Sequence, residues 1–360
     1  MGLRSRLERA AALFVLNAPE TILRRLVGAP VRSPEGFELA LQGQALLWLM
    51  RVSRQPELHE RGVESGRRLL DHTGRVLDMT GIHDVAVVDR TVPGATGPRS
   101  ARVYTPTAAR AHADVPVLGP ALVWFHGGGF VLGSIDSHDG ACRALASQSG
   151  TVIVSVDYRL APEHRFPAGV DDAIAATRWV LENGASMGVD ATNVAVGGDS
   201  AGGNLAALVS LALRGAPRAP VFQLLIYPAT DLTRSMPSHR LFREGVFLPE
   251  QTILWFMERY LPDRSFETDP RASPFFAPDL SGLPPALVLT AGFDPLRDEG
   301  RAYADRMRAA GVDVEYVCSE GSMHGFINTA GGLTESRRML TLAADRLRKA
   351  LSRRPVASAA

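Results

Sequence analysis

The middle of the chain carries the sequence Asn193-Val-Ala-Val-Gly-Gly-Asp-Ser-Ala-Gly-Gly203. Its first four residues form a short apolar run typical of a strand buried on both faces. The Ala- and Leu-rich stretch Asn204–Leu213 follows and favours a helix. Between them stands Gly-x-Ser-x-Gly, a motif that lifts a serine out of a sheet on a tight strand-to-helix turn. Only glycine fits beside such a turn, at Gly198 and Gly202, without a clash of Cβ atoms. Ser200 is therefore the candidate nucleophile.

Short apolar runs and helix-like segments alternate from residue 82 onward. The strand candidates are Ile82–Val88, Arg99–Tyr104, Ala121–Phe125, Thr151–Val156, Asn193–Val196, Phe222–Tyr227, Ala286–Thr290 and Val312–Val317. Helical segments lie near Ala141–Ser149, Val170–Glu182, Leu205–Leu213 and Gly300–Ala310. This alternation predicts a doubly wound, mostly parallel eight-stranded sheet with helices on both faces. Only a turn separates the first two strands, so we expect them to pair antiparallel at one edge of the sheet.

Two regions fall outside this alternation. Residues 1–80 read as helices interrupted by prolines, and nearly sixty residues separate the strand ending at Tyr227 from the one beginning at Ala286. A single crossover needs far less chain. We therefore divide the chain into an N-terminal helical cap segment (1–80), an α/β catalytic domain (81–230 and 271–351), an inserted second cap segment (231–270) and a frayed tail (352–360). The two cap segments are expected to cover the carboxyl ends of the strands, where open α/β sheets bind ligands.

The composition argues against several classes of function. The chain has 360 residues and a formal net charge of +1, which gives no electrostatic basis for binding nucleic acid. Cys142 and Cys318 are far apart and make no metal-ligand spacing, so free thiols are expected. We expect neither a metal nor another cofactor. The oligomeric state is left open between monomer and homodimer.

The N-terminus carries arginines before the apolar stretch Ala10–Leu16, which faintly resembles a secretory leader. Charged residues interrupt the approach, and no small-x-small cleavage site follows cleanly. Leu3, Leu7, Ala11 and Phe14 share one helical face. We expect an amphipathic helix that packs on its own protein, with at most a weak contact to a membrane surface. No stretch is long and apolar enough for stable membrane insertion, and a cytoplasmic location is expected.

A serine hydroxyl needs a neighbouring base, and that base needs a third group to orient it. In hydrolases with this type of turn, the acid and then the base follow the serine in chain order, each after a late strand. His324 follows the last predicted strand, and histidine titrates near neutrality unaided. Asp294 follows the strand Ala286–Thr290, whereas its rival Asp298 lies about one helical turn further away. The order and placement favour the triad Ser200, Asp294 and His324.

A reaction at a carbonyl group also needs donors for the oxyanion that develops on the carbonyl oxygen. His126-Gly-Gly-Gly-Phe130 follows the strand Ala121–Phe125, and its glycines let bare backbone N–H groups approach a substrate. Ala201 offers another N–H at the start of a helix. The spacing alone does not choose among the three glycines. A phosphate-binding loop is improbable because no Gly-Lys-Ser/Thr follows.

Five ordered motifs together closely resemble those of the bacterial hormone-sensitive-lipase-like esterases, in the branch whose turn reads Gly-Asp-Ser-Ala-Gly. They are His126-Gly-Gly-Gly129, Tyr158-Arg-Leu-Ala-Pro-Glu-His-Arg-Phe-Pro-Ala168, Gly198-Asp-Ser-Ala-Gly-Gly203, Asp294-Pro-Leu-Arg-Asp298 and His324-Gly-Phe326. The match covers about residues 82–350. The resemblance implies an α/β-hydrolase fold under a two-part cap and cofactor-free hydrolysis of short- to medium-chain carboxylic esters. It also implies that Gly128, Gly129 and Ala201 form the oxyanion hole, with Gly127 shaping the loop. The N-terminus is longer than the usual lead-in of this family.

Other residues of these motifs have structural interpretations. We expect His126 to brace its own loop, Asp199 to hydrogen-bond near the turn, and Glu163 with Arg159 to tie the segment after the fourth strand to neighbouring loops. Phe130 and Tyr158 are candidates for lining the substrate pocket, although burial in the core would explain them equally well.

The sequence thus predicts a serine carboxylesterase acting on small, apolar esters. The same triad would serve an amidase or an acyltransferase, and a lipase for long-chain triglycerides is also compatible with it. A non-catalytic ligand receptor on this fold, such as the plant gibberellin receptors that resemble this family, would typically lack the base that His324 provides here.

Overall fold

The computed structural model describes residues 3–107 and 118–352. Its centre is an eight-stranded sheet in the order β1-β2-β4-β3-β5-β6-β7-β8. The strands are β1 (Val85–Gly94), β2 (Gly97–Pro106), β3 (Gly119–Phe125), β4 (Val152–Val156), β5 (Val189–Asp199), β6 (Gln223–Ile226), β7 (Ala286–Phe293) and β8 (Val314–Met323). β2 pairs antiparallel with β1 and with β4, and all other pairs are parallel. The predicted α/β fold and the antiparallel pair at the edge are confirmed. Of the predicted frayed tail, residues 353–360 lie outside the described residues.

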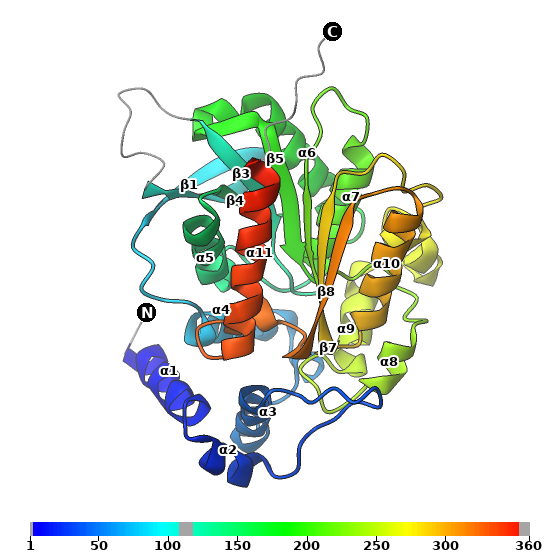
Figure 1. Cartoon of the computed structure of the whole chain (residues 1–360). Coiled ribbons are helices and arrows are strands. Elements are labelled where there is room, and N and C mark those ends of the chain that lie inside the picture. Colours follow the sequence, from blue (N-terminus) through cyan, green and yellow to red (C-terminus); the bar gives the residue numbers. More distant parts are fainter. Residues whose placement is uncertain (1–2, 108–117, 353–360) are drawn as a thin grey trace.

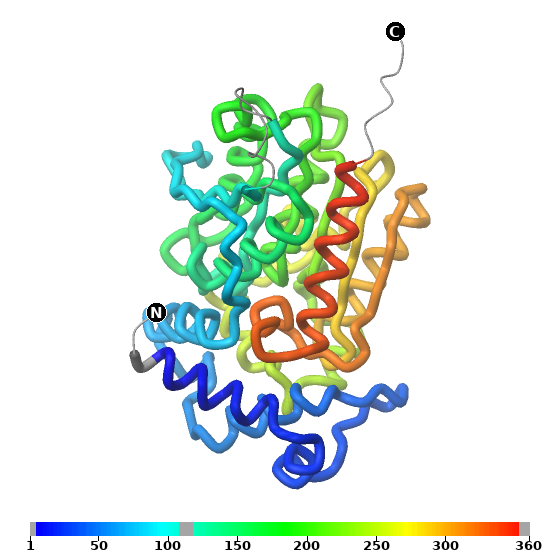
Figure 2. Tube along the Cα trace, turned by 60° about the vertical axis from the view of Figure 1, so that its left-hand side comes forward, coloured from blue at the N-terminus to red at the C-terminus, as the bar shows by residue number. Residues whose placement is uncertain are grey.

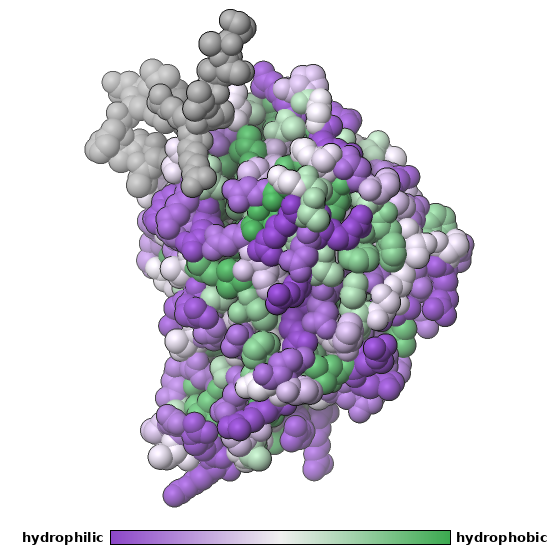
Figure 3. Space-filling view, turned by 45° about the vertical axis from the view of Figure 1, so that its right-hand side comes forward, coloured by the Kyte–Doolittle hydropathy of each residue, from purple (hydrophilic) through white to green (hydrophobic). Residues whose placement is uncertain are grey.

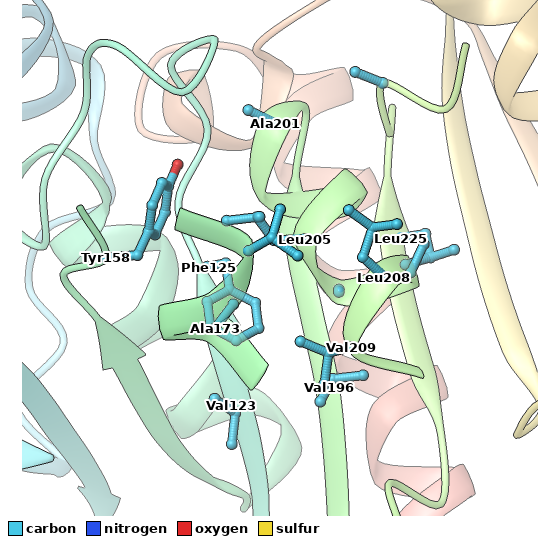
Figure 4. Packing of buried hydrophobic residues seen from close by; sticks show 14 of the residues in the cluster. Val123, Phe125, Tyr158, Ala173, Val196, Ala201, Leu205, Leu208, Val209 and Leu225 are labelled. Atoms are coloured by element: carbon cyan, nitrogen blue, oxygen red, sulfur yellow. The ribbon is translucent and has the colours of Figure 1, made fainter. Parts of the chain in front are cut away.

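Helices cover both faces of the sheet (Figure 1). One face carries α6 (Ala168–Asn183), α7 (Ala201–Leu213) and α10 (Arg297–Ala309), and the other carries α5 (Asp139–Ser149) and α11 (Thr334–Ser352). β3 alternates between the two cores: Val123 and Phe125 belong to the first, and Leu122 and Trp124 to the second. This alternation follows from the two-residue period of a strand. Figure 4 shows the first core at close range, with Val209 of α7 lying beside Val196 of β5.

The N-terminal region is helical, as predicted. It comprises α1 (Leu3–Leu16), α2 (Glu20–Val27), α3 (Leu41–Ser53), the short 3-10 helix η1 (Leu58–Glu60) and α4 (Val63–Leu77). A single isolated bridge, between Arg32 and Glu38, is its one piece of β pairing within the described residues. A third apolar cluster joins α3 to the ends of β7 and β8, through Leu39 and Leu46 against Phe293 and Met323. Figures 1 and 2 show α1, α2 and α3 gathered at that end of the molecule.

The predicted packing face of α1 is wrong. Leu7 and Phe14 are 63% and 82% exposed, whereas Leu16 at the end of the same helix is fully buried. Hydrogen bonds decide the orientation of α1 instead. Arg9 donates from Nη1 to the carbonyl oxygens of Val76 and Asp78 at the end of α4, both at 2.9 Å. Carbonyl groups at a helix C-terminus have no partner within their own helix, so these bonds turn the face of α1 that carries Arg9 inward.

The insertion between β6 and β7 holds α8 (Pro237–Leu241), α9 (Glu250–Tyr260) and the 3-10 helices η5 (Arg264–Thr268) and η6 (Pro274–Phe276). The other 3-10 helices are η3 (Asp136–His138), η4 (Gly184–Met187) and η7 (Phe326–Thr329). In the space-filling view of Figure 3, apolar residues on the visible face lie in small groups among polar ones. Among the described residues, no helix is long and apolar enough to cross a membrane.

Candidate active site

The strand-to-helix turn holds Ser200 in a strained backbone conformation. Ser200 has φ +55° and ψ −118° between β5 and α7, a region that non-glycine residues rarely adopt. Both flanking glycines are required by close packing. A Cβ on Gly198 would lie 2.4 Å from Gly202, and one on Gly202 would lie 1.9 Å from the carbonyl oxygen of Phe125. The turn therefore has the geometry expected from its motif.

The structure brings Ser200, His324 and Asp294 into one hydrogen-bonded chain. Nε2 of His324 is 2.9 Å from Oγ of Ser200, and its Nδ1 is 2.8 Å from Oδ2 of Asp294. Asp294 is fully buried, while His324 and Ser200 keep 8% and 9% of their surface exposed. A base between a hydroxyl and a carboxylate is the arrangement that activates a serine for attack on a carbonyl carbon.

The rival carboxylate, Asp298, points elsewhere. Its Oδ2 accepts the backbone N–H of Ser238 at 2.9 Å, and its Oδ1 pairs with Arg297 at 2.8 Å. Asp294 in turn is oriented by the backbone N–H of Leu296, which donates to Oδ1 at 2.8 Å and leaves Oδ2 for the imidazole. The geometry thus favours Asp294 over Asp298 as the partner of His324.

The glycines after β3 form a loop beside Ser200. Gly128 and Gly129 have φ +120° and +61°, and a Cβ on Gly128 would lie 2.3 Å from the carbonyl oxygen of Leu132. In the described part of the chain, the backbone N–H groups of Gly128, Gly129 and Ala201 donate to no other protein group. These three donors are therefore free to bind an oxyanion.

Aromatic side chains of the insertion lie directly on these loops. The ring of Phe256 on α9 lies so close to Gly129 that a Cβ there would be 2.2 Å from Cγ of the ring. The ring of Phe247 lies near Gly325, where a Cβ would be 3.1 Å from Cε1 of the ring. The insertion therefore contacts both the glycine loop and the residue that follows His324.

Phe130 and Tyr158, the candidates for substrate contact, are packed against other protein groups. Each is 2% exposed. Phe130 stacks on Tyr260 with ring centroids 3.8 Å apart. Tyr158 stacks on His126 at 4.5 Å and donates its hydroxyl proton to the carbonyl oxygen of His126 at 2.8 Å. Both rings thus support the glycine loop from within the core.

The remaining motif residues hold loops in place, with one correction. His126 braces its own loop, as expected, through a contact of 2.8 Å between Nδ1 and the carbonyl oxygen of Gly127. Arg159 and Glu163 were expected to reach neighbouring loops, but they pair with helices. Arg159 binds Asp172 on α6 at 2.7 Å, and Glu163 binds Arg67 on α4 at 2.7 Å. Carboxylate and guanidinium partners on helices cannot be located from local sequence.

Comparison with known proteins agrees with this geometry. Residues 122–328 match the family model described as the alpha/beta hydrolase fold. The chain belongs to this family. Among the relatives of this α/β hydrolase, the esterase LipI of Mycobacterium tuberculosis is 41% identical over 273 residues, which is 75% of this chain and 83% of the relative. An ethyl acetate hydrolase of Pseudomonas putida is 39% identical over 252 residues, or 69% of this chain and 78% of the relative.

A solved structure supports the same family. An α/β-hydrolase enzyme from the metagenome of Lake Arreo superposes on this hydrolase with a TM-score of 0.82 at 42% identity, covering 86% of this chain and 98% of that one. The resemblance to the hormone-sensitive-lipase-like carboxylesterases, which the motifs indicated, is thereby confirmed.

Proposed function

We propose that this protein is a serine carboxylesterase that hydrolyses short- to medium-chain carboxylic esters. It is a carboxylic ester hydrolase, like the relatives named as esterases. The observation that carries the proposal is the chain of contacts from Ser200 through His324 to Asp294, at 2.9 and 2.8 Å.

In the proposed reaction, Oγ of Ser200 attacks the acyl carbon while Nε2 of His324 takes its proton. Asp294 keeps the imidazole in the tautomer with a proton on Nδ1 and stabilises the imidazolium that forms. The N–H groups of Gly128, Gly129 and Ala201 bind the oxyanion of the tetrahedral intermediate. His324 then donates its proton to the leaving alkoxide, and the acyl group remains on Ser200. Water activated by His324 releases the acid and restores the serine.

The division of the chain into cap and catalytic segments is also part of the proposal. We assign residues 1–80 and 231–270 to a cap over the catalytic domain, and the contacts of Phe256 and Phe247 with the two loops support the assignment of the second segment. The substrate is a small molecule. A cytoplasmic location and a monomeric or homodimeric state also remain proposals. The exposed Leu7 and Phe14 of α1 are compatible with a weak contact to a membrane surface.

The test uses p-nitrophenyl butyrate. We expect Ser200→Ala and His324→Ala to fold like the wild type and to turn over at near-background rates, and Ser200→Ala to lose labelling by a fluorophosphonate probe. Undiminished hydrolysis by Ser200→Ala would remove the serine from the mechanism. A series of p-nitrophenyl esters from C2 to C16 then tests the chain-length preference, and a maximum of activity at the long end would favour a lipase. Parallel assays with amides and with acceptor alcohols test whether the triad serves an amidase or an acyltransferase.

A further inference from the structure

Asp199, the residue before Ser200, holds the start of the glycine loop. It is 3% exposed, and its Oδ1 accepts the backbone N–H of Gly127 at 2.8 Å. Its Oδ2 fills the space where a side chain on Gly127 would begin, since a Cβ there would be 2.5 Å away. Gly127 leads directly into Gly128 and Gly129. This one carboxylate therefore ties the serine turn to the loop that carries two of the oxyanion donors.

The partner of Asp199 is His138 on η3, which is 1% exposed and which sequence reasoning did not single out. Its Nε2 is 3.1 Å from Oδ1 of Asp199. Its Nδ1 is 2.8 Å from Oγ of Ser137, and that hydroxyl donates its only proton to the carbonyl oxygen of Ser134 at 2.8 Å. With that hydroxyl directed at Ser134, Nδ1 donates to Ser137, while Nε2 faces a carboxylate, which only accepts. This set of partners favours a proton on each ring nitrogen, and therefore an imidazolium at His138.

Asn328, on the 3-10 helix η7 that follows His324, completes the surroundings of this ring. Its side-chain amide lies 2.9 Å from Nε2 of His138, and as oriented its Oδ1 has no hydrogen-bond partner among the described residues. With its oxygen turned toward the ring, this amide accepts from the protonated Nε2, which then shares its one proton between Oδ1 of Asn328 and the carboxylate of Asp199. The amide nitrogen then takes the position that has no partner.

The charges around the pair agree with this protonation. Burial alone would lower the pKa of His138, but the charge and hydrogen bond of Asp199 raise it. Burial alone would raise the pKa of Asp199, but His138 and the N–H of Gly127 hold it below its usual range. The ring of His126 lies 5.7 Å from that of His138, and burial lowers its pKa to about 4, so it is neutral.

The pair also reaches the loop of the catalytic base. Oδ2 of Asp199 accepts the hydroxyl proton of Tyr227 at 3.3 Å, and that hydroxyl oxygen accepts the backbone N–H of Ile327 at 3.4 Å. The ring of Tyr227 packs against the ring of His324 with centroids 4.6 Å apart. One buried ion pair thus contacts the glycine loop, the serine turn and the loop after His324.

We propose that the His138–Asp199 ion pair is a positioning device for the oxyanion hole: it fixes Gly127 and so aims the N–H groups of Gly128 and Gly129. The inference rests on the proposed esterase function. A donor stabilises the oxyanion only when it is held in advance at hydrogen-bond distance from the position that the oxyanion will occupy. Neither side chain touches the substrate. Both are positioning residues, and their loss should weaken binding of the transition state more than binding of the ester.

The test compares two substitutions at Asp199. Asp199→Ala removes the acceptor for Gly127 N–H, and we expect kcat for p-nitrophenyl butyrate to fall about 10- to 100-fold with KM changed less than threefold. Complete loss of an oxyanion donor costs about 100- to 1,000-fold, and a displaced donor should cost less. Asp199→Asn keeps an acceptor oxygen for Gly127 but loses the charge that pairs with His138, so we expect it to recover only part of kcat. Asp190→Ala, which removes a half-buried carboxylate near the start of the same strand, is the matched control.

A transition-state analogue separates positioning from a general structural role. We expect the Ki of a trifluoromethyl ketone to rise in Asp199→Ala by the same factor as kcat/KM falls, and to stay at the wild-type value in Asp190→Ala. Wild-type Ki in Asp199→Ala would overturn the proposal, as would equal losses in Asp199→Ala and Asp199→Asn. The proposed esterase function is tested separately, because it fails only if wild-type turnover survives in Ser200→Ala.

A second measurement does not depend on whether the Asp199 variants fold. In protein with ¹⁵N-labelled histidine at pH 7, long-range ¹H–¹⁵N correlation distinguishes an imidazolium from either neutral tautomer, and His138→Gln assigns the signal. We expect both ring nitrogens of His138 to have the shifts of protonated nitrogens. A neutral tautomer would refute the ion pair and with it the proposal.

Discussion

The contact between Gly129 and Phe256 gives the sharpest test of how the insertion lies on the glycine loop. Gly129→Ala has two costs. The residue has φ +61°, and an L-residue in the left-handed region loses roughly 1–2 kcal/mol. The new methyl group would also lie 2.2 Å from Cγ of Phe256, and overpacking of this kind costs about 1–3 kcal/mol. We therefore expect the free energy of unfolding to fall by about 2–5 kcal/mol.

Two further variants separate the costs. Gly150→Ala is the control for the backbone, because Gly150 has φ +71° and nothing within 4 Å of its Cβ position. It should show the conformational cost alone. Phe256→Ala removes a buried ring, 6% exposed, and should cost about 3–5 kcal/mol. In the double variant the added methyl group has room, so the overpacking of about 1–3 kcal/mol should disappear.

The assay is urea denaturation of the four variants and the wild type, with kcat for p-nitrophenyl butyrate measured in parallel. We expect the double variant to be more stable than the sum of the single changes predicts, and to regain part of the activity lost in Gly129→Ala. Contacts that are independent give additive changes within about 0.5 kcal/mol. Additive changes in the free energy of unfolding would mean that Phe256 does not contact Gly129 in solution. The position of α9 on the glycine loop would then be wrong.

Two other predictions concern single carboxylates. Asp294→Asn should leave the fold intact and lower kcat by about 10³- to 10⁴-fold, because an amide favours the wrong tautomer of His324. The kcat of Asp298→Asn should stay within tenfold of the wild-type value. The opposite ranking would mean that Asp298 is the acid of the triad. Burial raises the pKa of Asp78 from 3.8 to about 7. Between these two pH values the folded state holds a proton that the unfolded state has lost. The free energy of unfolding therefore falls by up to about 1.4 kcal/mol per pH unit as the pH rises. Urea denaturation from pH 4 to 8 should therefore give a shallower decline in Asp78→Asn than in wild type, and equal slopes would contradict the assignment.

Much of the fold could be predicted because its signals are local. The apolar runs of β3, β4 and β7 are buried on both faces and therefore stand out from their surroundings. The strand ends were less well predicted. β8 extends to Met323, six residues beyond the predicted end at Val317, because its polar last part has no apolar strand pattern although Cys318, Ser319 and Met323 still pair with β7. The long C-terminal helix α11 was not among the predicted segments, although its buried residues recur at helical spacing from Met339 to Leu351.

What local sequence could not supply was the choice of partner. An apolar face at helical spacing predicts that α1 packs through Leu7 and Phe14, yet the unpaired carbonyl groups at the end of α4 bind Arg9 and decide the orientation. Arg159 and Glu163 behave in the same way, since their partners Asp172 and Arg67 belong to helices. Polar groups that are satisfied across long distances in the chain have no periodic signal, so their pairing appears only in three dimensions.

The same reasoning explains why the candidate triad was predictable and its support was not. In a parallel sheet the loops at the carboxyl ends of neighbouring strands must meet at one edge, so Ser200, Asp294 and His324 can be inferred from their places after β5, β7 and β8. His138 follows no strand end directly and carries no motif, and its contact with Asp199 depends on how the loop before α5 folds back over the sheet. Sheet topology brings the reacting groups to one edge of the molecule. It aligns them only coarsely, whereas an oxyanion hole requires tenths of an ångström, and that precision has to come from buried polar contacts such as the one between Asp199 and Gly127.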